Sequence, residues 1–160
     1  FSALALLALH GTISAGLPYN DSLNNPDNFL SPADVSVKGL LGQAISMSER
    51  GRLRTLPEWN NGRLITMFSQ EARNNNKTTD WYGEHAGKWL YSAALAVART
   101  GNDTLKALLF RTAYYLVNNQ EADGYFGSYS PELRITNKNS KLHKKSWYVW
   151  RLNYMILGLL

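Results

Sequence analysis

The 160-residue chain contains no cysteine and only three histidines. The lack of cysteine excludes disulfide bonds, thiolate zinc sites and a cysteine nucleophile within these residues. His10, His85 and His143 do not have the spacing of helical metal-binding motifs. There is also no phosphate-binding glycine loop and no G-x-S-x-G nucleophile motif. The sequence therefore points away from several common metal, nucleotide and serine-hydrolase sites.

Charge is sparse as well. Charged residues make up 18% of the chain and hydrophobic residues 44%, which is typical of a globular protein and not of a disordered one. The net charge of +5 permits an anionic partner but does not require one. The single basic run, residues 138–145, is short and is interpreted as a solvated loop. We therefore expect no nucleic-acid partner, and no apolar run is long enough to predict a membrane span.

The beginning of the chain resembles a secretory signal. Residues 1–9 form an apolar run and residues 11–16 are small, which matches the end of a signal segment whose basic start is missing. A buried helix is the alternative. Three sequons, at Asn20, Asn76 and Asn102, agree with a secreted protein but also arise by chance in an Asn-rich chain.

Both ends suggest a piece of a longer protein. Residue 1 is Phe, and residues 155–160 form an apolar run without a helix stop signal. We expect a clipped signal segment over residues 1–16 and an irregular entry segment over residues 17–34. Residues 35–160 are then the N-terminal part of one domain.

Hydrophobic spacing predicts an all-α domain. Helices are expected over residues 35–50, 84–100, 104–119 and 146–160, and no useful β-alternation occurs. The second helix has apolar positions 89, 90, 93, 94, 97 and 98 on one face. Gly101 is expected to cap its C-terminus and Asn102 to cap the next helix. Turn residues at 57–62 and Gly124 and Gly127 predict breaks.

A first candidate motif is W-Y-G-E-H-A-G-K-W, residues 81–89. Glu84 and Lys88 are four residues apart and can form an ion pair on a helix, and an acid in the first turn suits the helix dipole. The functional alternative is a sugar site. Aromatic rings stack on the C–H face of a sugar, while Glu84, His85 and Lys88 would bind its hydroxyl groups.

A second candidate is the loop of residues 118–129, with the sequence N-N-Q-E-A-D-G-Y-F-G-S-Y. Asp123 and Gly124 are a turn signal. The loop is expected to present Gln120, Asp123, Tyr125 and Tyr129 at one mouth of a helical bundle. The alternative is a tight loop whose aromatic side chains pack back on the helices.

A third candidate is an aromatic stripe near the end of the chain. Trp147, Trp150 and Tyr154 have the i, i+3, i+7 spacing that places them on one helix face. A stripe of this kind is more typical of a core than of a binding site.

Taken together, the three motifs resemble the N-terminal part of glycoside hydrolase family 127, the β-L-arabinofuranosidase-like group. The similarity covers about residues 31–160, and the order and spacing of all three motifs agree. The resemblance implies an (α/α)6 barrel, a helical toroid, of which this chain is a part. It implies a retaining enzyme that removes terminal β-L-arabinofuranosyl or related residues from plant-type glycans.

The resemblance also implies a nucleophilic cysteine in a zinc–thiolate cluster and a glutamate acid/base, which lie further along the chain in the family. No catalytic residue and no metal or cofactor is therefore expected within these residues, although zinc is implied for the full-length enzyme. Family members often carry a histidine or an acid where this chain has Tyr148, Arg151 and Leu152, so the exact sugar stays open.

The residues predicted to bind carbohydrate are Glu84, His85, Lys88, Gln120, Asp123, Tyr125, Trp147, Trp150 and Tyr154. We expect a secreted glycoside hydrolase as the full-length protein, with this chain inactive alone. Two alternatives are a noncatalytic helical carbohydrate-binding domain and a helical scaffold for protein partners.

Overall fold

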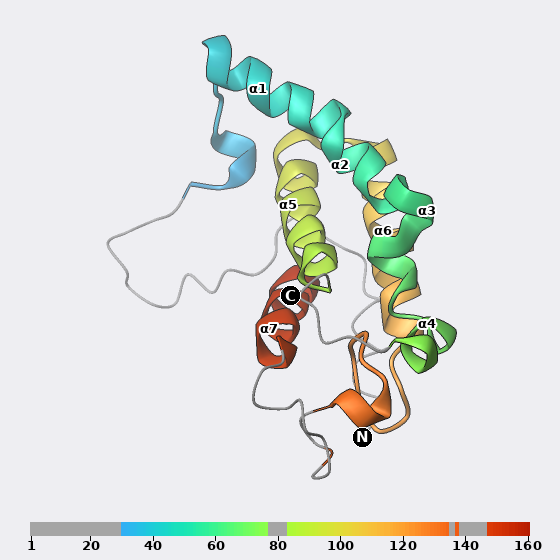
Figure 1. Ribbon diagram of the computed structural model, residues 1–160. Helices are drawn as coiled ribbons and strands as arrows, with labels where there is room; N and C mark the ends of the chain where they lie inside the picture. Colours follow the sequence, from blue (N-terminus) through green and yellow to red (C-terminus); the bar gives the residue numbers. More distant parts are fainter. Residues whose placement is uncertain (1–29, 77–82, 135–136, 138–146) are drawn as a thin grey trace, which may run out of the picture.

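The computed structural model describes residues 30–76, 83–134, 137 and 147–160. These residues are all-helical, and no strand occurs among them. The helices are α1 (Gly39–Arg50), α2 (Arg52–Thr55), α3 (Trp59–Thr66), α4 (Gln70–Asn75), α5 (Glu84–Thr100), α6 (Asp103–Asn118) and α7 (Tyr148–Leu159). Short 3-10 turns are η2 (Pro32–Asp34), η3 (Leu56–Glu58) and η4 (Pro131–Leu133). The all-α prediction is confirmed for these parts of the chain (Figure 1).

Several predictions concern residues outside the described ranges. They are the signal-like segment, the sequon at Asn20, the basic run 138–145 and the first two residues of the W-Y-G-E-H motif. The start of the first long helix was predicted four residues too early. Lys38 is extended and Gly39 has a φ of 67°, so α1 begins at Gly39 and not at Val35.

The α5–α6 hairpin follows the predicted capping residues. Gly101 has the left-handed φ of 62°, and its N–H donates to the carbonyl of Val97 at 2.8 Å. Asn102 caps α6, because its Oδ1 accepts a hydrogen bond from the N–H of Leu105 at 2.9 Å. The side chain of Asn102 thus closes a tight connection between the two longest helices.

The predicted turn at residues 57–62 is also present. Asn60, Asn61 and Gly62 all have positive φ values, of 52°, 55° and 71°. Asn and Gly adopt this left-handed conformation more readily than other residues. The turn changes the chain direction before the buried residues Leu64 and Ile65 of α3.

Helix α5 lies at the centre of the packing, with α6 and α7 against it (Figure 1). The indole N–H of Trp89 donates to the carbonyl of Leu53 at 2.8 Å and ties α5 to α2. The buried apolar side chains of this core are Leu64, Ile65, Phe68, Ala86, Trp89, Leu90, Ala93, Ala96, Leu105, Leu116 and Met155. One predicted core position is wrong: Ala98 is exposed, because the buried face of α5 runs through Ala86, Ala93 and Ala96 instead.

Helices α5 and α7 cross at very short range. A Cβ at Gly87 would overlap the carbonyl group of Tyr154, and a Cβ at Gly158 would lie 2.9 Å from the Cβ of Leu90. Only glycine leaves room for such a close backbone approach. The crossing fixes how α7 is presented to the first turn of α5.

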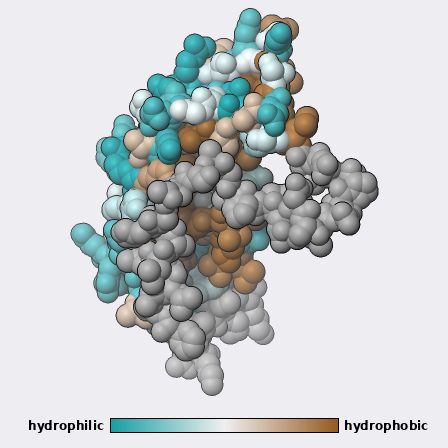
Figure 2. Space-filling view, turned by 180° about the vertical axis from the view of Figure 1, so that it is seen from behind, coloured by the Kyte–Doolittle hydropathy of each residue, from teal (hydrophilic) through white to brown (hydrophobic). Residues whose placement is uncertain are grey.

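Large apolar side chains also reach the surface. Leu40, Leu41 and Met47 of α1 are exposed, and α1 has no buried residue. Figure 2 shows hydrophobic residues gathered on one face of the molecule. Even so, none of the described helices is long and apolar enough to cross a membrane.

Candidate functional site

Glu84 is the first residue of α5, and its side chain is only 7% exposed. Its Oε1 accepts a hydrogen bond from the Nζ of Lys88, one turn later, at 2.6 Å. Its Oε2 accepts a hydrogen bond from the indole N–H of Trp150 on α7. The predicted i, i+4 ion pair between Glu84 and Lys88 is therefore present. Glu84 also bonds to a residue of α7, a contact that sequence spacing did not predict.

His85 lies beside this pair. Its Nδ1 is 3.9 Å from the Oε1 of Glu84, and its side chain is 37% exposed. The first turn of α5 thus gathers a carboxylate, an imidazole and an ammonium group, as the W-Y-G-E-H-A-G-K motif predicted.

We call Trp147, Trp150 and Tyr154 the aromatic row. The rings of Trp147 and Trp150 meet edge to face with centroids 6.2 Å apart, and those of Trp150 and Tyr154 with centroids 5.1 Å apart. Trp147 and Trp150 are 44% and 46% exposed, so the interpretation of this stripe as core is wrong. The Nζ of Lys88 lies 4.3 Å from the ring centroid of Tyr154, within cation–π range.

The loop residues Gln120 and Asp123 act on their own loop. The Nε2 of Gln120 donates to the carbonyl of Gly124 at 3.0 Å, and the Oδ1 of Asp123 accepts from the N–H of Tyr125 at 2.9 Å. Gly124 provides the positive φ of 88° that this turn requires. These contacts favour the alternative in which the loop is a tight structural turn.

Tyr125 is buried where the loop meets α7. Its hydroxyl oxygen accepts a hydrogen bond from the N–H of Tyr129 at 2.9 Å. The guanidinium carbon of Arg134 lies 3.6 Å from its ring centroid, and the ring of Tyr148 lies 5.8 Å away. Burial raises the pKa of Tyr125, and the bond from Tyr129 and the charges of Arg151 and Arg134 offset this only in part. Tyr125 is thus packed into the protein.

Sequence reasoning missed the acid that holds this loop in place. The Oε1 of Glu121 lies 2.9 Å from the Nε of Arg73 and 2.6 Å from an Nη of Arg134. Burial lowers the pKa of Arg134, but the hydrogen bond and charge of Glu121 outweigh it and the pKa is raised. Glu121 lies inside the quoted loop motif, but no spacing rule pairs it with an arginine 48 residues earlier.

Arg151 is a second residue that the sequence did not single out. It is 4% exposed, and its guanidinium carbon lies 3.5 Å from the ring centroid of Tyr129. It also donates to the Oγ of Ser128. A Cβ at Gly83 would lie 2.8 Å from its Cδ. Arg151, on α7, therefore packs against Gly83 of the first motif and against Ser128 and Tyr129 of the loop motif.

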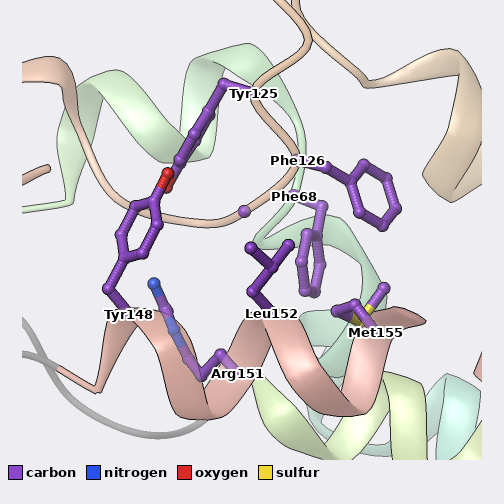
Figure 3. A pocket seen from close by; sticks show the side chains of 8 residues that line it. Phe68, Tyr125, Phe126, Tyr148, Arg151, Leu152 and Met155 are labelled. Carbon is purple, nitrogen blue, oxygen red and sulfur yellow. The ribbon is translucent and has the colours of Figure 1, made fainter. Parts of the chain in front are cut away.

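A small hollow lies between α7 and the loop (Figure 3). It is lined by Phe68, Tyr125, Phe126, Gly127, Tyr148, Arg151, Leu152 and Met155. Its volume is about 240 Å³ with open solvent included, below the roughly 300–1,000 Å³ of typical ligand pockets. The space between the side chains is about that of one water molecule. The hollow is therefore too narrow for a sugar ring.

The predicted residues thus form two groups separated by α7. Glu84, His85 and Lys88 join the aromatic row on the outer side. Gln120, Asp123 and Tyr125 lie in the loop on the other side. The outer group combines two exposed tryptophans with a hydrogen-bonded ion pair. This combination suits stacking on the C–H face of a sugar and bonding to its hydroxyl groups.

A zinc–thiolate centre does not fit the residues of this chain. The sequence has no cysteine. No group of three His, Asp or Glu side chains that could hold a metal occurs in the described part of the chain. We therefore derive no step that passes through a metal from these residues.

A comparison with protein families matches residues 42–160 to the model for the β-L-arabinofuranosidase GH127 catalytic domain. The matched range includes all three motifs and both groups of residues beside α7. No match was found among curated proteins or among solved structures.

Proposed function

Because this chain belongs to the family of β-L-arabinofuranosidase GH127 catalytic domains, we propose that it is part of a hydrolase that removes terminal arabinofuranosyl or related residues from plant-type glycans. The family match is the observation that carries the proposal. The all-helical architecture supports it, and we propose that these helices are part of an (α/α)6 barrel.

The role proposed for these residues is sugar binding. The two tryptophans of the aromatic row are solvent-exposed, and the row lies beside a buried carboxylate and an ammonium group. An exposed cluster of large rings next to polar groups is typical of a recognition surface. Since the chain has no cysteine, we propose that it forms one wall of the site and does not supply the nucleophile.

Secretion is part of the same proposal. The N-terminal apolar run and the sequons support it. At Asn102 the Oδ1 caps α6, which leaves the amide nitrogen outside the capping bond. A protein exported by a eukaryotic host should carry a glycan there that peptide N-glycosidase removes, and an unmodified Asn102 would count against this part.

The decisive experiment measures hydrolysis of p-nitrophenyl β-L-arabinofuranoside by the whole protein. We expect release of arabinose with retention, and we expect Trp150→Ala to lower kcat/KM about ten-fold, which corresponds to about 1.4 kcal/mol. Tyr114→Ala removes an equally exposed ring on α6 and should leave kcat/KM unchanged. Binding of arabinofuranosides without hydrolysis would instead identify a noncatalytic carbohydrate-binding domain, and neither binding nor hydrolysis would favour a protein scaffold.

A further inference from the structure

Glu84 is the one acid of the outer group, and the simplest interpretation gives it direct contact with a sugar hydroxyl. The geometry points to a different role: we propose that Glu84 is a positioning residue, which holds Trp150 and Lys88 in the orientation that receives the sugar. The sugar in this inference comes from the proposed function, on which that part rests. The contact between Glu84 and Trp150 is independent of the proposed function.

Glu84 has little capacity left for a ligand. Its side chain is 7% exposed, and each of its two oxygens already accepts a hydrogen bond from the protein. A buried carboxylate is stable only when donors and positive charge compensate for the loss of water. Each oxygen has a second lone pair, but at 7% exposure a sugar hydroxyl reaches the carboxylate only if Lys88 or Trp150 moves aside, which removes part of that compensation.

Trp150, in contrast, keeps much of its surface open to a ligand. An indole has a single donor, its N–H, and Glu84 takes that donor. The hydrogen bond at one end and the ring of Tyr154 at 5.1 Å on the other side fix the indole plane, while 46% of the residue stays exposed. A platform that is held before the ligand arrives loses less side-chain entropy on binding.

Lys88 is held by the same carboxylate. Its Nζ is 2.6 Å from the Oε1 of Glu84 and lies 4.3 Å and 5.8 Å from the ring centroids of Tyr154 and Trp150. The Lys88 side chain is 43% exposed, and its ammonium group has three donors, of which Glu84 uses one. Lys88 can therefore offer a donor at the edge of the aromatic row, at a place that Glu84 determines.

A multiple-mutant cycle separates the two roles of Glu84. The probe is p-nitrophenyl β-L-arabinofuranoside with the whole protein, and the readout is KM. Glu84→Ala alone should raise KM about ten-fold. In the background Trp150→Phe with Lys88→Met, Glu84→Ala should add less than two-fold, because the groups it positions are already gone. Equal ten-fold effects in both backgrounds would show direct sugar contact and overturn the proposal.

A second readout needs no sugar, so it distinguishes a failure of this inference from a failure of the proposed function. Hydrogen exchange of the Trp150 indole N–H, identified by its loss in Trp150→Phe, should speed up at least ten-fold in Glu84→Ala. Glu84→Gln keeps an acceptor of the same shape, so it should keep the slow exchange and fold normally. Unchanged exchange in Glu84→Ala would overturn the inference.

Matched controls complete the experiment. Glu71 is an exposed acid in the first turn of α4, so Glu71→Ala removes a first-turn carboxylate without touching the aromatic row. It should change neither the exchange of Trp150 nor KM. If Glu84→Ala does not fold, Glu84→Gln takes its place in the same mutant cycle: an increase in KM that disappears in the background Trp150→Phe with Lys88→Met supports positioning. An effect of equal size in both backgrounds rejects it.

Discussion

The two sides of α7 differ in how their aromatic and charged residues are used. On the side facing the loop, the ring of Tyr148 packs against those of Tyr125 and Tyr129, and Arg151 is buried against Tyr129 and Ser128. On the outer side, the two tryptophans of the aromatic row are exposed, and the row touches α5 through the Glu84–Lys88 pair. The same helix thus presents one side that holds the fold and one that is open to a ligand.

This difference shows why aromatic content alone is a poor guide to a binding site. Tyr125 and Tyr129 are as aromatic as the row, but their hydroxyl groups are used in internal hydrogen bonds and their faces lie against arginines. Trp147 and Trp150 keep much of their surface in water. Exposure to solvent therefore separates the two sides, and it cannot be read from the spacing of residues along a helix.

The largest difference between the two sides should appear in stability. Arg151→Ala leaves a gap below the ring of Tyr129 and removes the bond to Ser128, so we expect the free energy of unfolding of the whole protein to fall by about 2–5 kcal/mol. Trp147→Ala on the outer side should change it by less than about 1 kcal/mol. Urea unfolding followed by circular dichroism measures both. Similar losses would contradict the division into a structural side and an open side.

A smaller effect is expected where α7 crosses α5. Gly87→Ala places a methyl group against the carbonyl of Tyr154 and forces the helices apart, which should cost about 1–3 kcal/mol. Because this movement shifts the aromatic row relative to Glu84, the indole N–H of Trp150 should also exchange faster. Ser92→Ala changes an exposed position of the same helix and serves as the control. Unchanged stability in Gly87→Ala would mean that the crossing is looser than the structure shows.

Much of the fold could be predicted from the sequence, because its signals are local. The ends of α5 and α6 depend on Gly101 and Asn102, which act on residues within four positions of themselves. The turn at Asn60–Gly62 is local in the same way. The exposure of α1 was not predicted, and the spacing of the aromatic row left core and binding site open, because exposure depends on which other helices cover these faces.

The candidate site was predictable in its residue types and less so in its assembly. The spacing of Glu84 and Lys88 gave their ion pair, but the bond from Trp150 joins residues 66 positions apart. The links from Glu121 to Arg73 and from Arg151 to Ser128 are also long-range. Contacts of this kind follow from how distant segments of the chain pack together, and sequence spacing does not encode that geometry.

The weakest of the three effects concerns pH. Burial raises the pKa of Tyr148 above its ordinary value of 10.0, and the charge of Asp123 raises it further. The charges of Arg134 and Arg151 lower this pKa but do not reverse the shift. Below pH 10 the phenol is protonated in the folded and the unfolded protein, so it adds no pH dependence. Above pH 10 the unfolded chain loses this proton first, so the free energy of unfolding falls until the folded protein ionises too.

Tyr148→Phe tests this link between burial and the side of α7 that faces the loop. Its ring is half-buried between those of Tyr125 and Tyr129, at centroid distances of 5.8 and 6.2 Å, and phenylalanine keeps that packing. We expect the variant to match the parent protein at pH 8 and to lose less stability between pH 10 and 11, as measured by urea unfolding at each pH. The difference should be smaller than the losses in Arg151→Ala and Gly87→Ala, because water screens a half-buried group. An equal decline in both proteins would mean that the phenol of Tyr148 is exposed to water, like the tryptophans on the outer side of α7.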